Sequence, residues 1–522
     1  MADEKRSWSV PVKLESLPDG KPVIVRVAGQ SLILVREGSR VYAFGQRCPH
    51  YGMSLESGKI CGGQVVCPWH QARFDLNTGR PLSPPGLKLL EVYQVRVVEG
   101  MVLVEQRLQT EKVVKVTSNR QIVIAGAGAA GVAAAMTLRR CGFDGQVTVI
   151  SPESDWPYDR PSLTKDYLLG SASEEKIALF SPEDYQRNGI QFLFGRKVVG
   201  VQRGERKILL DNGQALSYEK LILATGGQPR KLGLAGAKMP GVFYLRTKRQ
   251  ALTIREYLPG VNRVVVIGSG FLGLETAASL RKKGLEVYVV TPENFPLGRI
   301  FGEHVGKYFL KIHQGKGINF YRQSRVVELI SCPQGIAVLV DRGERVEAEM
   351  VIVGVGMEVD TSYLEKTGLN EIAGVPVDTR QRTADPDILA AGDLALVPDW
   401  LDGGRQRVEH WAEAERQGQE AARSVLELSP GEAGVPFFWT TQYNILFRYV
   451  GFSGKFDQVC FRGYPEEGNF LAGYFYQGRI AGCGGVGFQE ELMTIRELLA
   501  SRIPVKPEQF TDSNFDLRTL LP

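Results

Sequence analysis

Short apolar runs alternate with turn residues over the first part of the chain. The runs VIVRVAG, SLILV, VYAFG, QVRVVEG and MVLVEQ are separated by glycine, proline and aspartate. Strands joined by turns of this composition are typical of small β domains. Residues 1–106 are therefore predicted to form an all-β domain, and the polar, charged residues 107–120 are predicted to form a linker.

From Gln121 the pattern changes. The runs QIVIAGAG, VTVIS, KLILATGG, RVVVIGSG, VYVVT and MVIVGVG are short and continuously apolar, and helical segments separate them. Parallel strands that are covered by helices on both faces have this pattern. From about Pro436 the chain is rich in predicted strands again, and it ends with a predicted helix over 489–501.

Two glycine-rich turns stand out in the α/β part. AGAGAAG and, about 140 residues later, IGSGFLG each follow an apolar run and open a helix. In this context G-x-G-x-x-G lets a pyrophosphate approach backbone N–H groups at a helix N-terminus. The candidate phosphate-binding glycines are Gly126, Gly128 and Gly131 in the first turn and Gly268, Gly270 and Gly273 in the second. Two such turns predict two bound dinucleotides.

These patterns predict a multidomain fold. An N-terminal all-β domain precedes two Rossmann-like α/β dinucleotide-binding domains, and a C-terminal α+β domain follows them. A family resemblance described below implies that the second α/β domain, residues 246–365, interrupts the first, which takes residues 121–245 and 366–430. Residues 431–522 form the predicted C-terminal domain.

Composition excludes several classes of protein. The 522 residues carry 63 basic and 58 acidic side chains, and this excess of +5 is spread along the chain, so no nucleic-acid partner is expected. No apolar run reaches the roughly 18 residues of a membrane helix, and the first ten residues contain no apolar signal core. The seven cysteines are scattered and odd in number, unlike a secreted disulfide framework. We expect a cytoplasmic protein without a membrane partner.

A metal-binding constellation lies in the first domain. Cys48, His50, Cys67 and His70 follow the pattern C-x-H, sixteen residues, C-x-x-H. Two thiolates and two imidazoles can hold a tetrahedral zinc ion, or a [2Fe–2S] cluster in which histidines replace two cysteines on one iron. Glycine and proline surround both ligand pairs, so two loop tips can meet and turn backbone N–H groups toward cluster sulfurs. This environment favours the cluster over zinc.

CPHYGMSLESG and CPWHQARFDLNTG resemble the Rieske ferredoxin family, and the resemblance covers roughly residues 8–106. It implies that Cys48 and Cys67 hold the buried iron, while His50 and His70 hold the outer one. It also implies a centre of the low-potential ferredoxin type, which a reduced flavin can feed.

The remainder resembles the oxygenase-coupled ferredoxin reductases and the apoptosis-inducing-factor group. WPYDRPSLTKDYL (156–168), LILATGG (221–227) and DILAAGD (387–393) carry this resemblance, which spans about residues 120–520. It implies that FAD is held at the first glycine turn and that NAD(P)H binds at the second. Asp393 is then the partner of the FAD ribityl chain, and Glu153 is the acid that binds a ribose 2′-hydroxyl.

By the same resemblance, Lys165 and Glu275 form the catalytic pair beside the flavin ring. A cation near the reactive flavin nitrogen stabilises negative charge on the reduced flavin, and a carboxylate fixes that cation. His410 and Trp411 precede a helix whose N-terminus can face the flavin, and Trp439 resembles the family's aromatic cover. Trp411 can equally be a core residue. Further expected cofactor contacts are Arg160, Thr225, Gly226, Gly356 and Gly392.

The preference between the two pyridine nucleotides rests on the residues after the strand EVYVV. The acid that binds the ribose diol of NAD is expected there, and the chain has Thr291, Pro292 and Glu293. Glu293 can serve, and no arginine stands immediately there for a 2′-phosphate. We therefore expect NADH as the hydride donor, with NADPH as the alternative.

Two activities are excluded by what the sequence lacks. No C-x4-C dithiol accompanies the first α/β fold, so disulfide-reductase chemistry is not expected. The histidines left after the cluster, His304, His313 and His410, show no close pairing for the mononuclear iron of an oxygenase.

The predicted function is that of an NAD(P)H-dependent flavoprotein reductase. Hydride passes from the nicotinamide to FAD, and single electrons pass to the fused Rieske centre or to an external acceptor such as a terminal oxygenase. The alternatives are an NADH-responsive redox sensor like the apoptosis-inducing factors, or an NADH oxidase. A homodimer is compatible with the sequence but not required by it.

Overall fold

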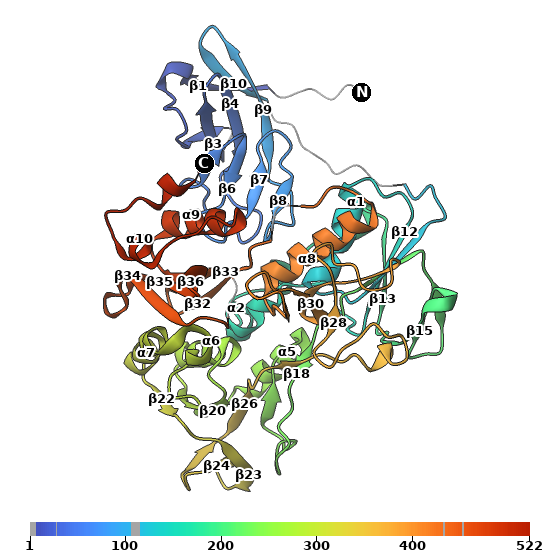
Figure 1. The fold of residues 1–522 in the computed structure, drawn as a ribbon, viewed down its shortest axis with the longest axis vertical. Helices are drawn as coiled ribbons and strands as arrows, with labels where there is room; N and C mark the ends of the chain where they lie inside the picture. The colour runs from blue at the N-terminus through green and yellow to red at the C-terminus, as the bar shows by residue number, and fades with distance from the viewer. Residues whose placement is uncertain (1–6, 28, 106–114, 432–433, 452–453, 522) are drawn as a thin grey trace.

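The computed structural model describes residues 7–27, 29–105, 115–431, 434–451 and 454–521. Figure 1 shows an N-terminal β domain at one end, a C-terminal domain beside it, and two α/β domains that make up the rest. The predicted multidomain fold class is confirmed. The predicted linker lies outside the described residues over 107–114, and residues 115–120 have no regular structure.

The N-terminal domain contains two antiparallel sheets. The larger has the order β1-β10-β9-β4-β3-β2 and the smaller the order β5-β6-β7-β8. Their bounds are β1 Ser7–Lys13, β2 Val23–Val27, β3 Gln30–Glu37, β4 Arg40–Gly45, β5 Lys59–Cys61, β6 Gln64–Val66, β7 Arg73–Asp75, β8 Pro81–Ser83, β9 Val92–Val98 and β10 Met101–Glu105. Phe44, Val65 and Phe74 are fully buried between them. The loops that follow β4 and β6 carry the predicted metal ligands.

The first α/β domain is built on a parallel sheet with the order β13-β12-β11-β17-β29. The bounds are β11 Gln121–Ala125, β12 Gln146–Ser151, β13 Ile190–Phe194, β17 Lys220–Leu223 and β29 Ile388–Ala390. β29 follows the second α/β domain in the sequence but pairs with β17 of the first. The first domain is therefore formed by two segments of the chain. The same two segments also contain shorter elements: η2 Arg160–Thr164, α2 Asp166–Leu169, α3 Glu174–Ile177, α4 Pro182–Arg187, β14 Val198–Gln202, β15 Lys207–Leu210, β16 Ala215–Ser217, β28 Val375–Pro376, β30 Ala395–Pro398 and β31 Arg405–Gln406.

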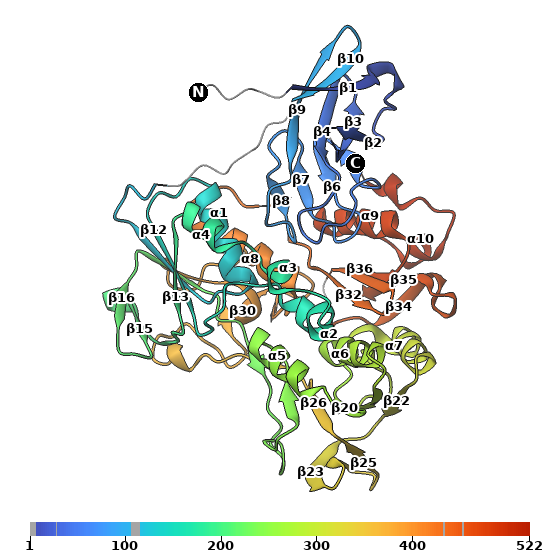
Figure 2. The same ribbon diagram turned by 180° about the vertical axis from the view of Figure 1, so that it is seen from behind.

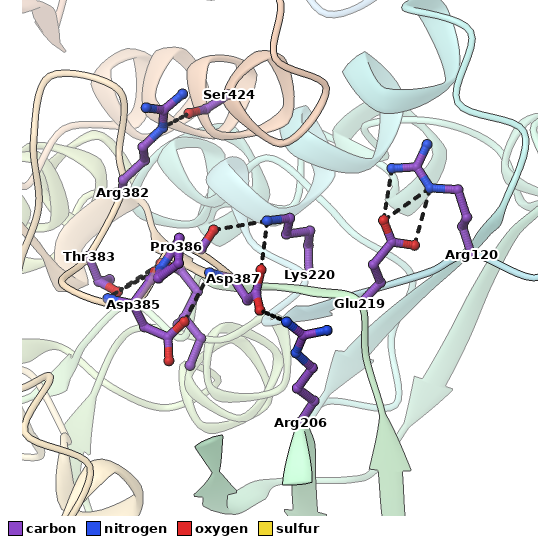
Figure 3. Close-up of polar contacts among 11 residues, drawn as sticks. Arg120, Arg206, Glu219, Lys220, Arg382, Thr383, Asp385, Pro386, Asp387 and Ser424 are labelled. Carbon is purple, nitrogen blue, oxygen red and sulfur yellow. Dashed lines mark hydrogen bonds and ion pairs between the residues drawn. The ribbon is translucent and has the colours of Figure 1, made fainter. Parts of the chain in front are cut away.

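Ion pairs join the two segments at the edge of this sheet where β17 and β29 begin (Figure 3). Lys220 Nζ lies 2.7 Å from Asp387 Oδ1 and donates to the Pro386 carbonyl at 3.0 Å. Asp387 also pairs with Arg206. These contacts fix the start of β29, whose far end leads directly into the predicted site residues Gly392 and Asp393.

Two helices from distant parts of the chain pack closely on the same domain. They are α1 (Ala129–Arg140) and α8 (Trp411–Val425), which lie side by side in Figure 1 and Figure 2. Small residues allow this approach: a Cβ on Gly418 of α8 would lie 2.1 Å from the Ala130 carbonyl oxygen of α1. The second segment therefore holds the helix that the first glycine turn opens.

The second α/β domain has a parallel sheet of its own, with the order β19-β26-β20-β21-β22. The strands are β19 Val242–Tyr244, β20 Arg263–Ile267, β21 Glu286–Val290, β22 Ile318–Tyr321 and β26 Met350–Val353, and the helices are α5 Lys248–Tyr257, α6 Phe271–Lys282 and α7 Gly298–Gly315. β19 falls within the segment predicted for the first domain, yet it pairs with β26. A further antiparallel sheet consists of β23 Val326–Cys332, β24 Gly335–Val340 and β25 Arg345–Ala348, and a strand pair consists of β18 Gln228–Pro229 and β27 Met357–Glu358.

The C-terminal domain is an antiparallel sheet with the order β32-β33-β36-β35-β34. The bounds are β32 Phe437–Gln442, β33 Ile445–Gly451, β34 Gln458–Tyr464, β35 Asn469–Tyr476, β36 Arg479–Val486, α9 Gln489–Ala500 and α10 Pro507–Thr511. One core cluster joins this sheet to α9 and α10, and an aromatic cluster joins it to α6 and α7. Both views show α9 beside the N-terminal domain. Within the described residues, no helix combines the length and the apolarity needed to cross a membrane.

Candidate active site

A cavity of about 560 Å³ lies at the junction of the first α/β domain, α6 and β32. Its volume is in the range of cofactor sites. Thirteen of the predicted cofactor residues line it: Gly126, Gly128, Glu153, Arg160, Lys165, Thr225, Gly226, Glu275, Gly392, Asp393, His410, Trp411 and Trp439. The structure thus gathers residues from both segments of the first domain, from α6 and from the C-terminal domain.

The first glycine turn fits a pyrophosphate. A Cβ on Gly126 would lie 2.1 Å from the Ala224 carbonyl oxygen, and one on Gly131 would lie 1.9 Å from the Gly126 carbonyl oxygen. Gly128, the N-cap of α1, faces open space. The turn is therefore packed behind and open in front, where the helix N-terminus meets the cavity. Gly131 supports the turn from behind and does not line the cavity.

Two pairs of oppositely charged side chains line the cavity. Glu153, two residues after β12, accepts from Arg160 Nη2 at 2.6 Å and from the Tyr158 hydroxyl at 2.5 Å. Arg246 Nη2 donates to Asp393 Oδ2 at 3.0 Å. Arg246 is a cavity residue that the sequence did not reveal, because it lies outside every recognisable motif.

The structure brings Lys165 and Glu275 together although they are far apart in the chain. Lys165 Nζ lies 2.6 Å from Glu275 Oε2, which also accepts from the Thr164 hydroxyl at 2.6 Å. The Thr440 hydroxyl donates to the other oxygen, Oε1, at 2.7 Å. Glu275 is 8% exposed, so these contacts hold a carboxylate that has little access to water. Thr164 and Thr440 are further residues that sequence motifs did not mark.

Aromatic side chains form one wall of the cavity. The His410 ring stacks on Phe438 with a centroid distance of 3.9 Å, and burial lowers the pKa of His410 to about 4. Trp411 Nε1 donates to Glu415 Oε1 at 2.8 Å while its ring packs on the core of the first domain. Trp411 therefore packs on the core and also lines the cavity.

The four predicted metal ligands meet at the tip of the N-terminal domain as two pairs. Cys48 and Cys67 are buried, and the Cys48 thiol donates to the Cys67 sulfur, which is the main reason that the pKa of Cys67 falls to about 7. The His50 and His70 ring centroids are 5.1 Å apart. Burial lowers the pKa of His50 to about 3, and both its ring nitrogens are buried without a hydrogen-bond partner among the described residues.

This pairing fits a two-iron centre. In the part of the chain that the structure describes, no three histidine, cysteine, aspartate or glutamate side chains converge on one metal position. A Rieske centre needs a thiolate pair on one iron and an imidazole pair on the other, and the Cys48–Cys67 and His50–His70 pairs supply both. Buried imidazole nitrogens without partners suit the same role.

Trp439 lies between the two sites. Its ring lines the cavity, and its centroid is 4.4 Å from that of His70 and 5.6 Å from that of His50. Further contacts join the domains nearby: the Tyr51 hydroxyl donates to Asp159 Oδ2 at 2.9 Å, and Arg448 bonds the loop that carries His70. Their roles depend on domain docking, for which the sequence carries no signal.

The second glycine turn opens α6, whose first residues, Phe271 and Leu272, line the cavity, whereas the glycines of the turn do not. A Cβ on Gly268 would lie 2.2 Å from the Gly354 carbonyl oxygen, whereas Gly270, the N-cap of α6, faces open space. Glu293 is half-buried, and among the described residues its Oε2 has no hydrogen-bond partner. Because this oxygen is buried without a partner among the described residues, a ligand hydroxyl can satisfy it. The predicted residues Gly268, Gly270, Gly273, Glu293 and Gly356 do not line the large cavity.

Comparison with known proteins identifies three regions. The family described as pyridine nucleotide-disulphide oxidoreductase matches residues 120–418, the Rieske [2Fe-2S] domain matches residues 7–94, and the reductase C-terminal domain matches residues 437–521. All seven cysteines lie in the described ranges and form no disulfide there, and no two of them have the C-x4-C spacing.

Individual relatives match over most of their length. Apoptosis-inducing factor 3 of Homo sapiens is 33% identical over 506 residues, covering 94% of this chain and 83% of that protein. Rhodocoxin reductase of Rhodococcus erythropolis is 35% identical over 399 residues, covering 76% of this chain and 93% of that protein. In the crystal structure of the covalent putidaredoxin reductase–putidaredoxin complex, one chain matches with a TM-score of 0.74 at 31% identity, covering 77% of this chain and 98% of that one. The chain therefore belongs to the pyridine nucleotide-disulphide oxidoreductase family and carries a Rieske [2Fe-2S] domain at its N-terminal end, so that it uses FAD, NAD(P)H and a [2Fe–2S] centre.

Proposed function

We propose that this protein is an NAD(P)H-dependent reductase with a built-in Rieske ferredoxin. When bound, FAD accepts hydride from the nicotinamide, and the [2Fe–2S] centre carries single electrons onward. The observation that carries this proposal is the position of Trp439, which lines the cavity and packs against both His50 and His70. One side chain thus spans the flavin site and the cluster site.

We assign the large cavity to FAD. The first glycine turn binds the pyrophosphate, Asp393 and Glu153 bind the ribityl and ribose hydroxyls, and Arg246 orients Asp393 through its ion pair. Lys165 supplies positive charge beside the flavin ring, and Glu275 holds that lysine in place. The aromatic wall excludes water from the ring.

We assign the second glycine turn to the nicotinamide nucleotide. Its helix, α6, carries Glu275 on the turn after Gly273, so a nucleotide on this helix N-terminus has its nicotinamide near the cavity. Glu293, with its free carboxylate oxygen, favours the 2′-hydroxyl of NADH over a 2′-phosphate.

We assign Cys48 and Cys67 to one iron and His50 and His70 to the other. The external acceptor proposed for this centre is an oxygenase-type protein, because relatives of this chain include the ferredoxin–NAD(+) reductase component of an anthranilate 1,2-dioxygenase system of Burkholderia cepacia. The odd number and scattered spacing of the cysteines support a reducing compartment such as the cytoplasm. The homodimer stays a prediction.

Electron paramagnetic resonance tests the proposal. The purified holoprotein is mixed anaerobically with NADH, frozen, and compared with a dithionite-reduced sample. We expect the same Rieske-type signal from both reductants. A signal that dithionite produces and NADH does not would contradict the internal relay.

The likeness to apoptosis-inducing factor 3 supports a second candidate function, because that match extends beyond the reductase region to 94% of the chain. In this alternative, NADH converts the protein to a long-lived complex with a changed oligomeric state. Turnover with cytochrome or dye acceptors separates the two. Rapid turnover favours the reductase, and a persistent charge-transfer band with altered elution volume favours the redox-responsive protein.

A further inference from the structure

A buried arginine of the C-terminal domain holds the loop that carries two of the proposed cluster ligands. Arg448 lies on β33 and is 7% exposed. Its Nε donates to the Trp69 carbonyl oxygen at 2.9 Å, and its Nη2 donates to the Pro68 carbonyl oxygen at 3.1 Å. Both carbonyls belong to the segment between Cys67 and His70.

The two peptide units that accept from Arg448 also point at the Cys67 sulfur. The N–H groups of Trp69 and His70 are hydrogen-bonded to Cys67. The first peptide unit joins the Pro68 carbonyl to the Trp69 N–H, and the second joins the Trp69 carbonyl to the His70 N–H. Each unit therefore has the guanidinium at its oxygen and the sulfur at its hydrogen. A cation on the carbonyl polarises a peptide and strengthens the bond that its N–H donates.

Among the residues that the structure describes, no acidic side chain forms an ion pair with Arg448. Burial lowers the pKa of Arg448 to about 10, and the negative charge of Cys67 opposes that shift. Buried cations are ordinarily paired with an anion, and the group next to Arg448 that could balance its charge is the Cys67 sulfur. Other cations, Lys88 and Lys165, act on His50 and His70 respectively.

We propose that Arg448 is a positioning residue that docks the Cys67–His70 loop on the reductase and raises the reduction potential of the Rieske centre held there. Reduction adds one electron, and thus one negative charge, to such a centre without forming or breaking a bond. A buried positive charge and stronger N–H bonds to the ligand sulfur both stabilise that added charge. The inference rests on the proposed function, because it takes Cys67 and His70 as ligands.

A redox titration of the full-length holoprotein, followed by the Rieske paramagnetic signal, tests this role. We expect Arg448→Gln to lower the equilibrium constant for reduction of the cluster by about tenfold. For one electron this corresponds to a decrease of about 59 mV in the midpoint potential. Arg448→Lys keeps the charge but not the two-pronged contact, so we expect a smaller decrease. Arg462→Gln is the matched control: Arg462 is also buried on the same sheet and donates to carbonyls, but those belong to residues 509–515.

The outcomes are distinct. An Arg448→Gln variant with the midpoint of the unmodified protein overturns the inference, as does an equal decrease in Arg462→Gln. If the glutamine variant does not retain its cluster, the lysine variant decides, and a midpoint at or above that of the unmodified protein overturns the inference. A missing Rieske signal in the unmodified, dithionite-reduced protein contradicts the proposed function instead.

Discussion

The ion pair between Lys165 and Glu275 lies where three domains meet. Glu275 sits near the N-terminus of α6, and Lys165 follows η2 of the other α/β domain. Two hydroxyls, from Thr164 and from Thr440 of the C-terminal domain, complete the carboxylate's hydrogen bonds. Three domains thus converge on one side chain, which makes the lysine's position depend on all of them.

Replacing Glu275 by Ala tests that organisation. Lys165 loses its partner and becomes free to move, so we expect NADH to reduce the flavin at least about tenfold more slowly, while FAD stays bound. Anaerobic stopped-flow absorbance at the flavin band measures the rate. Glu286→Ala is a suitable control, because Glu286 pairs with Arg263 at a half-exposed site on β21. Unchanged flavin reduction in Glu275→Ala would remove this pair from the active site.

His313 predicts a pH effect on stability. It is fully buried, and its Nε2 lies 2.7 Å from Gln442 Oε1. Burial lowers the pKa of His313 to about 4, below the ordinary value of 6.5. The unfolded state therefore binds more protons than the folded state between these values. Stability from keeping this ring neutral is present above pH 6.5 and is lost as the pH falls toward 4.

The expected loss for this one group between pH 7 and pH 5 is about 2 kcal/mol. We compare thermal unfolding of the unmodified protein and of His313→Gln at both pH values. The destabilisation caused by the substitution should shrink at pH 5. A difference in Tm that is the same at both pH values would show that His313 does not titrate in this way.

At the scale of elements, the packing of α1 against α8 controls the shape of the cavity. α1 begins at the first glycine turn, and α8 begins beside His410. Gly418 permits their contact, and Gln417 Oε1 accepts from the Gly392 N–H at 2.8 Å. Two consecutive residues of α8 thus support α1 next to the first glycine turn and the Gly392 backbone.

We expect Gly418→Ala to destabilise the protein by about 1–3 kcal/mol, because the new Cβ overlaps the Ala130 carbonyl. FAD should also be released more readily during purification or dilution. Thermal unfolding and the ratio of flavin to protein absorbance measure the two effects. Gly204→Ala is the control, since nothing lies within 4 Å of its added Cβ. Equal behaviour of the two variants would contradict the packing argument.

The strands of the parallel sheets and the helices at the glycine turns could be predicted from the sequence. Contacts between segments that are distant in the chain could not. Continuous apolar runs identified both parallel sheets, and the glycine turns identified α1 and α6, because strand burial and helix N-termini leave local patterns. The membership of β19 in the second sheet was not predictable, since a short strand fits either neighbour. Arg246, Thr440 and Arg448 were missed because their roles arise only when distant segments meet.

At the scale of the whole molecule, docking of the N-terminal domain sets the relation between the two redox sites. The cluster tip meets the reductase through Trp439, the Tyr51–Asp159 hydrogen bond and Arg448. The ring nitrogens of His50 are buried at this interface. The N-terminal domain therefore packs against the side of the cavity that Trp439 lines.

Replacing Trp439 by Leu should separate the two halves of the reaction. We expect flavin reduction by NADH to stay within about twofold of the original rate, because Lys165 and Glu275 remain. Reduction of the cluster should slow by about tenfold or more, since the aromatic contact between the sites is lost. Trp439→Phe, which keeps an aromatic ring, is the matched control. Equal cluster reduction in the leucine variant and the original protein would exclude this role for Trp439.

In the proposed function, electrons from NADH reach the cluster within one chain. Stopped-flow mixing of the holoprotein with NADH, followed at the flavin and cluster absorption bands together, tests it most directly when repeated over a tenfold range of protein concentration. We expect the flavin band to bleach first and the cluster band to follow at a rate independent of protein concentration. A cluster band that never changes, or whose rate rises in proportion to protein concentration, would contradict it.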